Sequence, residues 1–399
     1  MVIGIDASRA NVRERTGTEW YAFHLIRALT AIDRSNRYVL YLTEQPIDDL
    51  RQLGPNVTYR ILGWPFRLLW SQLRLSLEML RRPPDLLFVP AHTIPIIHPR
   101  STVTTLHDVG FERFPELYGR RPIGRPGLTG RLLGLVIRLL TLGRYGNSEL
   151  DYHRWSARLA ASKAAHVITV SQFTKSEIIS CYGTDAARIS VVHLGFDRTE
   201  FQRPPPPAID SAVARFRIAR PYAIFVGRLE RKKNITGVIN ALARARRTLP
   251  TLQLVLIGNP GLGWGEAERL IRMHRLDAAV YRLGWQPRHV YVPLLAGATA
   301  LVFISRYEGF GLPVLEAFAV DTPVIVASGS ALPEVAGSAA IAVAPDDTDG
   351  AARALIDLAS DNQLRRALLT RARQRLALFS WSRVAQATLA ILERVGQRR

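Results

Sequence analysis

The sequence predicts an α/β protein of two domains, each built around a parallel β-sheet with helices on its faces. Two observations support this prediction. With 399 residues, the chain is long enough for two domains of ordinary size. Strand-like apolar runs alternate with amphipathic segments of helical length, and the alternation starts again after a proline-rich stretch at 203–208. Ligands of such sheets bind beyond the carboxyl ends of the strands, so we expect functional residues in the loops that follow strands.

The first half, residues 1–200, contains runs typical of both strands and helices. Strands are predicted at 2–8, 38–43, 86–90, 103–107 and 167–170. Helices are predicted at 19–31, 67–80, 150–161 and 174–182. Ser171 precedes the last of these helices and is expected to cap it.

The stretch RPPPPA at 203–208 separates the two halves. Proline fixes φ and lacks an N–H group, so consecutive prolines favour an extended spacer over a helix or a central strand. We therefore predict domains at 1–200 and 208–380. The alternative is a rigid surface loop inside one domain.

The second half repeats the alternation. Strands are predicted at 222–227, 252–258, 280–283, 300–304, 323–326 and 340–343. Helices are predicted near 235–247, at 350–359 and at 381–395.

The composition restricts the class of protein. The single cysteine, Cys181, excludes an intramolecular disulfide and favours a reducing, cytoplasmic setting. No apolar stretch reaches the ~18 residues of a membrane-spanning helix, and the first residues are typical of a strand, not of a signal peptide. The net charge of +20 suits an anionic partner. However, only four of the 53 basic residues are lysines and no nucleic-acid-binding motif accompanies them, so we expect no nucleic-acid binding.

The stretch EGFGLPVLE at 308–316 lies between a predicted buried strand and a helix that we expect to begin at Leu312 and Pro313. Proline is tolerated there because the first N–H groups of a helix have no intrahelical partner. Glu308 falls in the loop and Glu316 falls about one turn inside the helix, on either side of a helix start suited to phosphate. The two carboxylates would then accept hydrogen bonds from sugar hydroxyls. Alternatively, one stabilises the helix start and the other is simply solvated.

The stretch VGRLERKKN at 226–234 follows the first strand of the second half. Its cations, among them Arg228 and Lys233, suit a diphosphate, because arginine binds as a bidentate fork and lysine as a point charge. The alternative is an ordinary solvated basic turn.

Together these stretches resemble the nucleotide-binding domain of the retaining glycosyltransferases of family 4. Members carry an arginine and a lysine after the first strand of the second domain, and a Glu-x7-Glu motif further on; the segment 330–345 is also similar to the family's. The resemblance covers nearly the whole second half. It implies the GT-B fold, with two Rossmann-like domains facing a central cleft and a C-terminal helix at 381–399 that crosses back to the N-terminal, acceptor-binding domain.

The resemblance also implies a role for each matching residue. Arg228 and Lys233 would hold the donor diphosphate and act in catalysis. Glu308 would contact the donor sugar as a catalytic residue, and Glu316 would contact the ribose. The rest of the donor site would be formed by Phe310, Gly311, Leu312 and, near the base, Leu332.

Two segments of the first half carry weaker matches. His107, in TLHDVGFERFPELY at 105–118, resembles the histidine of the family's loop beside the donor sugar, so we expect a catalytic role; the alternative is a structural histidine at a strand end. RTGTEW at 15–20 takes the place of the family's glycine-rich turn. Only Gly17 remains of that turn, as an expected donor contact, while Glu19 and Trp20 depart from it and leave the acceptor contacts undefined.

We expect no metal and no cofactor beyond the nucleotide-sugar donor. Asp347-Thr348-Asp349 has the form of the metal-binding triplet of another glycosyltransferase fold, but in PDDTDG it is typical of a turn and N-cap before helix 350–359. Arginine, lysine and a helix dipole can neutralise a leaving diphosphate unaided.

Two basic segments suggest where a binding partner could contact the protein. Residues 113–158 hold nine arginines against three acids, and 63–82 combine arginines with aromatic residues. Either both are helices packed on the sheet, or they make peripheral contact with an anionic membrane at its cytoplasmic face, where a lipid-linked acceptor would be presented.

We therefore expect a retaining, metal-independent hexosyltransferase that uses a nucleotide-diphosphate sugar, with GDP-mannose as the first candidate. The acceptor would be a glycan or lipid-linked sugar in cell-envelope polysaccharide or glycoconjugate synthesis. One alternative is a sugar-nucleotide 2-epimerase of the same fold, which would need acid–base carboxylates in the first domain. The other is a non-catalytic sugar- or nucleic-acid-binding protein, which would not explain Glu308 and Glu316 together with Arg228 and Lys233.

Overall fold

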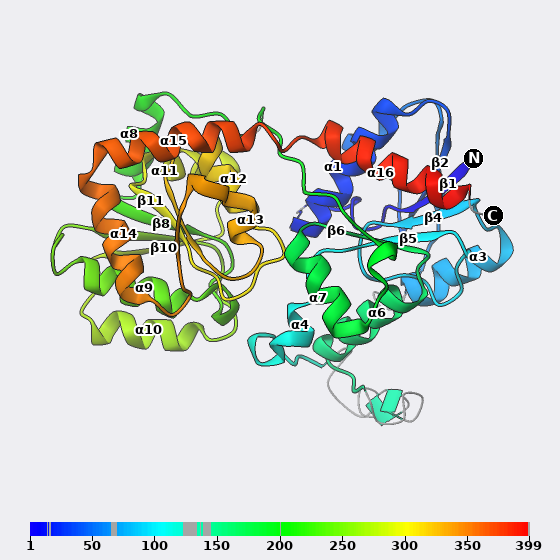
Figure 1. The fold of residues 1–399 in the computed structure, drawn as a ribbon, viewed down its shortest axis with the longest axis horizontal. Helices are drawn as coiled ribbons and strands as arrows, with labels where there is room; N and C mark the ends of the chain where they lie inside the picture. The colour runs from blue at the N-terminus through cyan, green and yellow to red at the C-terminus, as the bar shows by residue number, and fades with distance from the viewer. Residues whose placement is uncertain are drawn as a thin grey trace. The chain divides into compact units, whose positions relative to one another are not determined.

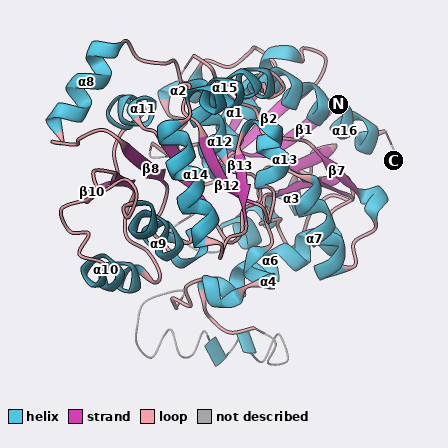
Figure 2. Ribbon diagram, turned by 60° about the vertical axis from the view of Figure 1, so that its left-hand side comes forward, coloured by secondary structure: helices cyan, strands magenta, loops and turns pink. Residues whose placement is uncertain are grey.

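The computed structural model describes residues 1–397 except 14, 16, 65–69, 123–133, 136, 139–144 and 200. Its contacts divide the chain into two compact units. The first unit comprises Met1–Gly195 and Ser380–Arg399, and the second comprises Phe196–Phe379. Each unit contains one parallel sheet covered by helices, as Figures 1 and 2 show.

Within the described residues of the first unit, seven parallel strands follow the order β3-β2-β1-β4-β5-β6-β7. They are β1 (Val2–Asp6), β2 (Arg37–Leu42), β3 (Val57–Ile61), β4 (Leu86–Val89), β5 (Thr102–Leu106), β6 (His166–Thr169) and β7 (Ile189–Val191). The sequence did not predict β3 and β7, which are the two edge strands. β3 is only half-buried and β7 has three residues, so neither forms the long buried apolar run that marks a central strand.

The helices of the first unit cover both faces of its sheet. They are α1 (Gly17–Ile32), α2 (Asp48–Arg51), the π-helix Trp70–Leu75, α3 (Ser76–Arg81), α4 (Gly110–Arg113), the 3-10 turns Pro115–Leu117 and Ala186–Arg188, α6 (Glu149–Lys163), α7 (Gln172–Tyr182) and α16 (Trp381–Gly396). One core joins Leu75 and Met79 to Ala160, Ala161 and Ile178 against the strands. The expected cap of α7 is confirmed, because Ser171 Oγ accepts a hydrogen bond from Thr174 N.

The C-terminal helix α16 belongs to the first unit. It packs along α1 and also touches β4 (Figure 1). Glu393, near its end, lies 3.4 Å from the side-chain amide of Asn36, and Gly396 lies against Met1. The chain therefore ends in the unit in which it begins.

Within the described residues of the second unit, six parallel strands follow the order β10-β9-β8-β11-β12-β13. They are β8 (Tyr222–Val226), β9 (Gln253–Ile257), β10 (Val280–Gly284), β11 (Ala300–Phe303), β12 (Val324–Ala327) and β13 (Ile341–Val343). β11 and β12 are buried at every position, as expected for central strands with helices on both faces.

In the second unit, α9 packs against α10 and α14, α8 packs against α11, and α12 packs against α15. Their bounds are α8 (Pro206–Arg215), the 3-10 turns Arg231–Lys233 and Gly337–Ala339, α9 (Ile235–Ala245), α10 (Trp264–Met273), α11 (Arg288–Gly297), α12 (Leu312–Ala319), α13 (Leu332–Ala336), α14 (Thr348–Ser360) and α15 (Asn362–Leu376). Figure 2 shows α14, α12 and α13 beside the strands β12 and β13.

The prediction of an extended proline spacer at 203–208 was wrong for its second half. Helix α8 begins at Pro206, with Pro205 at the N-cap in extended conformation. Proline is accepted there because the N–H groups of the first helical turn have no intrahelical acceptor. The whole stretch lies inside the second unit, and the chain passes between the units at Gly195–Phe196 and at Phe379–Ser380.

In each sheet the strand order reverses at one place, between β1 and β4 in the first unit and between β8 and β11 in the second. Loops that leave the strands at such a switch point turn to opposite faces of the sheet, and ligands of open α/β sheets bind between them. Among the described helices, none is both long and apolar enough to cross a membrane.

Candidate functional site

The switch point of the second unit holds a close ion pair. Lys233 ends the turn after β8, and Glu308 lies in the loop after β11. Lys233 Nζ donates to Glu308 Oε1 at 2.5 Å, and the two side chains are only 19% and 9% exposed. The structure therefore joins two predicted site residues that are 75 positions apart in the chain.

The backbone around Lys233 is held by Asn234. Asn234 has a left-handed conformation, with φ of 57°, and is fully buried. Its side-chain amide donates to the carbonyl groups of Ile304 (3.1 Å) and Pro345 (2.7 Å). Lys233 Nζ also lies 5.5 Å from the ring centroid of Phe303. Asn234 was not among the predicted site residues. Asparagine is one of the few residues that tolerate this conformation, so an asparagine between a strand-end turn and a helix start was a usable signal.

The start of α12 requires a glycine. Gly311 is the N-cap residue and has φ of 108°, and a Cβ at this position would lie 2.5 Å from Leu332 Cδ2. Leu332 is fully buried, so it packs against the helix start. Pro313 has no N–H and the N–H of Val314 donates to the carbonyl of Gly311 at 3.0 Å. The N–H groups of Gly311 and Leu312 have no acceptor in the described part of the chain.

The other residues of this loop fix its course. Phe310 is buried and meets Phe379 edge-on, with ring centroids 5.7 Å apart. The carbonyl of Glu308 accepts from Ala331 N at 3.2 Å. Leu312 is half-buried.

Glu316 lies in a different environment from Glu308. Tyr291 Oη, on α11, donates to Glu316 Oε2 at 3.4 Å. Burial raises the pKa of Glu316 to about 7, against the opposing effects of the Arg288 charge and the Tyr291 hydrogen bond. Neither Tyr291 nor Arg288 was predicted, because a site residue on α11 is recognisable only once that helix is placed beside α12.

Arg228, the other predicted cation, is not part of the Lys233–Glu308 ion pair. Its side chain is 58% exposed, and its Nε lies 3.6 Å from Glu230 Oε2. Such an exposed arginine can turn toward a ligand at small cost, because a surface pair of this kind contributes little to stability.

The predicted residues of the first unit lie in two different settings. His107 is half-buried, its Nε2 lies 3.2 Å from the carbonyl of Pro90, and Tyr21 meets its ring edge-on. Burial lowers the pKa of His107 to about 4, so the ring is neutral near pH 7 and its Nε2–H donates to Pro90. Gly17 is the exposed first residue of α1, and a Cβ there would meet nothing within 4 Å. Its backbone does not require glycine.

The predicted N-cap in the DxD-like triplet is confirmed. Asp347 Oδ1 accepts from Gly350 N at 2.7 Å and caps α14, while Asp349 pairs with Arg244. Among the residues described, no group of three or more His, Cys, Asp or Glu side chains is arranged to hold a metal ion.

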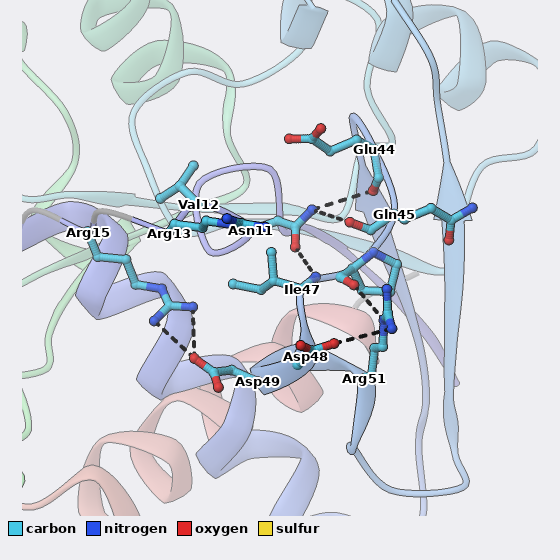
Figure 3. Close-up of a pocket in the computed structure, with 11 residues that line it drawn as sticks. Asn11, Val12, Arg13, Arg15, Glu44, Gln45, Ile47, Asp48, Asp49 and Arg51 are labelled. Carbon is cyan, nitrogen blue, oxygen red and sulfur yellow. Dashed lines mark hydrogen bonds and ion pairs between the residues drawn. The ribbon is translucent and has the colours of Figure 1, made fainter.

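A pocket of about 710 Å³ opens in the first unit between the loop after β1 and the loop after β2 (Figure 3). Asn11 joins the two loops, since its amide donates to Gln45 O (3.0 Å) and its Oδ1 accepts from Ile47 N (2.8 Å). Arg15 lies 3.5 Å from Asp49 across it. None of the predicted site residues lines this pocket.

The two halves of the chain match two family descriptions. Residues 15–200 match "Glycosyltransferase Family 4" and residues 210–375 match "Glycosyl transferases group 1". The O-antigen chain mannosyltransferase B of Escherichia coli is 28% identical over 318 residues, which are 78% of this chain and 81% of that protein. The MMP alpha-(1->4)-mannosyltransferase of Mycolicibacterium hassiacum is 30% identical over 59% of this chain and 55% of its own length.

Solved structures show the same fold. Anabaena Alr3699/HepE in complex with UDP and glucose superposes with a TM-score of 0.71 at 18% identity, over 98% of this chain and 99% of that one. WaaG, a glycosyltransferase involved in lipopolysaccharide biosynthesis, superposes with a TM-score of 0.70 at 14% identity, over 98% and 99% of the two chains.

Proposed function

The chain belongs to glycosyltransferase family 4 and has the GT-B fold, and on that premise we propose that it transfers a hexose with retention from a nucleotide-diphosphate sugar to a glycan or lipid-linked acceptor. Two mannosyltransferases among its relatives make GDP-mannose the first candidate donor. The O-antigen enzyme among them supports a role in cell-envelope polysaccharide or glycoconjugate synthesis.

The observation that carries this proposal is the Lys233–Glu308 pair at the switch point of the second unit. A cation, a carboxylate and the N–H groups of Gly311 and Leu312, which have no acceptor among the described residues, lie in the loops that follow β8 and β11. A phosphate needs the cation and the N–H donors, and sugar hydroxyls need the carboxylate. A nucleotide-diphosphate sugar presents both groups in one molecule.

In the proposed reaction the bond between C1 of the sugar and the phosphate oxygen breaks, and negative charge develops on the diphosphate. Lys233, Arg228 and the start of α12 stabilise that charge, so no metal is needed. The acceptor oxygen bonds to C1 on the face that the phosphate leaves, and its proton passes to a phosphate oxygen. Glu308 orients the sugar hydroxyls and Glu316 the ribose, while His107 remains a predicted catalytic residue and Gly17 a predicted donor contact.

A thermal-shift panel of GDP-mannose, UDP-glucose, UDP-galactose and ADP-glucose tests the donor. We expect one of them to raise the melting temperature of the wild type, since a ligand at 100 times its Kd stabilises by ~2.7 kcal/mol. Lys233→Ala should lose this shift, whereas Lys163→Ala, at an exposed lysine of the first unit, should keep it.

Two results would contradict the proposal. The first is an unchanged donor shift and turnover in Lys233→Ala and Glu308→Ala. The second is formation of an epimerised nucleotide sugar with no acceptor present, which would indicate the 2-epimerase.

We also propose that the protein works in the cytoplasm, at the inner face of an anionic membrane. Leu73, Leu77 and Leu80 form an exposed apolar stripe that runs from the π-helix into α3. Ile97, also exposed, adjoins it through a hydrogen bond of its N–H to Ser76 Oγ (3.1 Å). The exposed arginines Arg81 and Arg82 follow the stripe, which makes this face complementary to anionic headgroups. The basic segment at 130–144 lies mostly outside the described residues.

Co-sedimentation with phosphatidylglycerol vesicles tests this face. We expect binding of the wild type at low salt, weaker binding at physiological salt, and loss of binding in Leu77→Glu/Leu80→Glu. Leu378→Glu, at an exposed leucine of the second unit, is the matched control. No binding of the wild type at either salt concentration would end the proposal.

A further inference from the structure

Glu316, the proposed ribose contact, is held from one side by helix α11. Tyr291 on α11 donates a hydrogen bond from its Oη to Glu316 Oε2 at 3.4 Å. This distance is long for an O–H···O bond, so the contact restrains the carboxylate without fixing it alone. The other oxygen, Oε1, accepts no hydrogen bond in the described part of the chain. One oxygen of the carboxylate is thus tied to α11, and the other is available to a ligand hydroxyl.

Arg288, the first residue of α11, supplies a second restraint. Its positive charge acts on both the carboxyl of Glu316 and the hydroxyl of Tyr291. The guanidinium lies over the ring of Phe201, with 4.9 Å between its Cζ and the ring centroid. A guanidinium on an aromatic face keeps its charge and has a preferred orientation. Helix α11 therefore brings a hydrogen-bond donor and a positive charge to the same carboxylate.

A buried aromatic group holds the side chains of α11 in place. Phe201 is 4% exposed, and its ring centroid lies 5.2 Å from that of Phe196 and 6.4 Å from that of Tyr291. Phe196 and Tyr291 are themselves buried. Aromatic rings at such distances attract one another and pack in defined orientations. The Tyr291 hydroxyl therefore has little freedom to turn away from Glu316.

The burial of Glu316 gives these restraints a chemical consequence. Burial raises the pKa of Glu316 to about 7, while the charge of Arg288 and the hydrogen bond of Tyr291 oppose this increase. An ionised carboxylate accepts hydrogen bonds at both oxygens, whereas a protonated carboxyl carries an O–H in place of one acceptor. Two neighbouring ribose hydroxyls require acceptors. Near neutral pH, α11 therefore affects how much of Glu316 is in the form that ribose requires.

The other elements packed against α12 do not share this role. The strands β11 and β12 carry no ionisable side chain. The ionisable side chains on the two helices that also pack there are Glu334 on α13 and Arg365, Arg366, Arg371, Arg373 and Arg375 on α15. Among the described side chains, those that act on the pKa of Glu316 are Arg288 and Tyr291.

We propose that Tyr291 and Arg288 are positioning residues that hold the Glu316 carboxylate in place for the ribose hydroxyls of the donor. The inference rests on the proposed function and deepens it, because it adds to the donor site the side chains that support one of its carboxylates. Neither residue has to touch the nucleotide. A merely structural role would weaken donor binding equally at every pH, so the pH dependence of binding distinguishes the two roles.

Calorimetric titrations of the full-length protein from pH 5.5 to pH 9 test the proposal. The probes are GDP-mannose, UDP-glucose, UDP-galactose and ADP-glucose, whose diphosphates are esterified at both ends and do not titrate in this range. In the wild type we expect the affinity to rise with pH through about 7, as Glu316 ionises, and then to level off. In Tyr291→Phe and Arg288→Gln the rise should move to higher pH, because each change removes a group that lowers the pKa of Glu316.

The size of the effect should depend on pH. At pH 6 each variant should bind the donor about tenfold more weakly than the wild type, the effect of one hydrogen bond to a charged group. At pH 9, where Glu316 is ionised in every protein, the difference should fall below about threefold. Arg288→Lys keeps the charge and should recover part of the wild-type profile. The melting temperature reports whether each variant is folded.

Two matched variants of the same unit serve as controls. Tyr281→Phe removes a hydroxyl that donates to the carbonyl of Arg217 at 3.1 Å. Arg282→Gln removes a guanidinium that pairs with Glu268 at 2.9 Å. Both should keep the wild-type profile.

A titration without nucleotide separates this inference from the proposed function. The side-chain carboxyl ¹³C signal of Glu316, identified by its loss in Glu316→Gln, should titrate at higher pH in Tyr291→Phe than in the wild type. The same midpoint in both proteins, or an equal loss of donor affinity at every pH, would overturn the inference and leave the proposed function standing. Failure of all four nucleotide sugars to bind the wild type would contradict the proposed function, and the inference with it.

Discussion

The two sheets reverse their strand order in the same way, yet the side chains at the two switch points differ in charge. In the second unit, Lys233 and Glu308 form an ion pair beside a helix start whose first N–H groups have no acceptor in the part of the chain that the structure describes. In the first unit, the paired rings of His92, in the loop after β4, and His153, on α6, are neutral near pH 7. The charge of Arg9, in the loop after β1, is opposed by nearby carboxyls.

This difference teaches how one architecture can recognise two kinds of ligand. The topology decides where a ligand binds, because it decides where the loops diverge. The side chains in those loops decide the chemistry. Fixed charges suit a diphosphate, and neutral donors and acceptors suit a sugar.

The largest expected effect comes from breaking the charged pair of the second unit. Lys233→Met and Glu308→Gln should each lower kcat/KM about 10²–10³-fold, because each removes a group proposed to act on the reacting part of the donor. The double variant should lose much less than the product of the single effects, since each single change leaves its partner unpaired. Steady-state kinetics of the four proteins measure this coupling. If the loss of kcat/KM in the double variant equalled the product of the two single losses, Lys233 and Glu308 would not act as one coupled site.

The next largest effect is on stability, and it should differ between the two glycines predicted in the donor site. Gly311→Ala should lower the free energy of unfolding by about 3 kcal/mol, because alanine is strained at φ of 108° and its Cβ would clash with Leu332. Gly17→Ala should leave it unchanged or raise it by up to about 1 kcal/mol, because alanine favours a helix and its Cβ meets nothing. Urea unfolding compares the two variants. Equal effects would show that α12 does not depend on the backbone of Gly311.

The two units should also respond to pH in opposite directions. Glu316 has a pKa raised from 4.5 to about 7, so its contribution to stability is complete below pH 4.5 and is lost as the pH rises through 7. Glu316→Gln should therefore stabilise the second unit at pH 8, by about 2 kcal/mol, and have little effect at pH 4.5.

Three histidines of the first unit, His92, His107 and His153, have pKa values lowered from 6.5, that of His107 to about 4. Their contribution is present above pH 6.5 and is lost as the pH falls toward 4. Hydrogen exchange followed by mass spectrometry, compared peptide by peptide at pH 5 and pH 8, resolves the two units. The same pH response in both units would contradict this assignment.

The smallest effect concerns the DxD-like triplet. Asp347→Ala should cost about 1 kcal/mol of stability, because it removes the N-cap of α14. Turnover of the donor, measured with and without EDTA, should not change. A loss of activity that manganese restores would instead indicate a metal at this triplet.

Much of the candidate site of the second unit could be predicted from the sequence, because its determinants are local. Loops at 226–234 and 306–311 follow buried strands, and functional residues of a parallel sheet were expected in such loops, which is where Lys233 and Glu308 lie. The N-caps Ser171 and Asp347 depend on a few neighbouring residues and were predicted correctly.

Other features were decided only by the tertiary structure. His92 and His153 are 61 positions apart, and Gln72 and Tyr152 are 80 apart, so nothing local pairs them. The pKa values of His92 and Glu316 depend on burial, which exists only after the helices have packed. The sequence by itself determined the alternation of strands and helices and the loops that follow the strands. Packing decided which distant side chains meet in those loops, because contacts across a sheet depend on strand order and helix placement, which no single segment encodes.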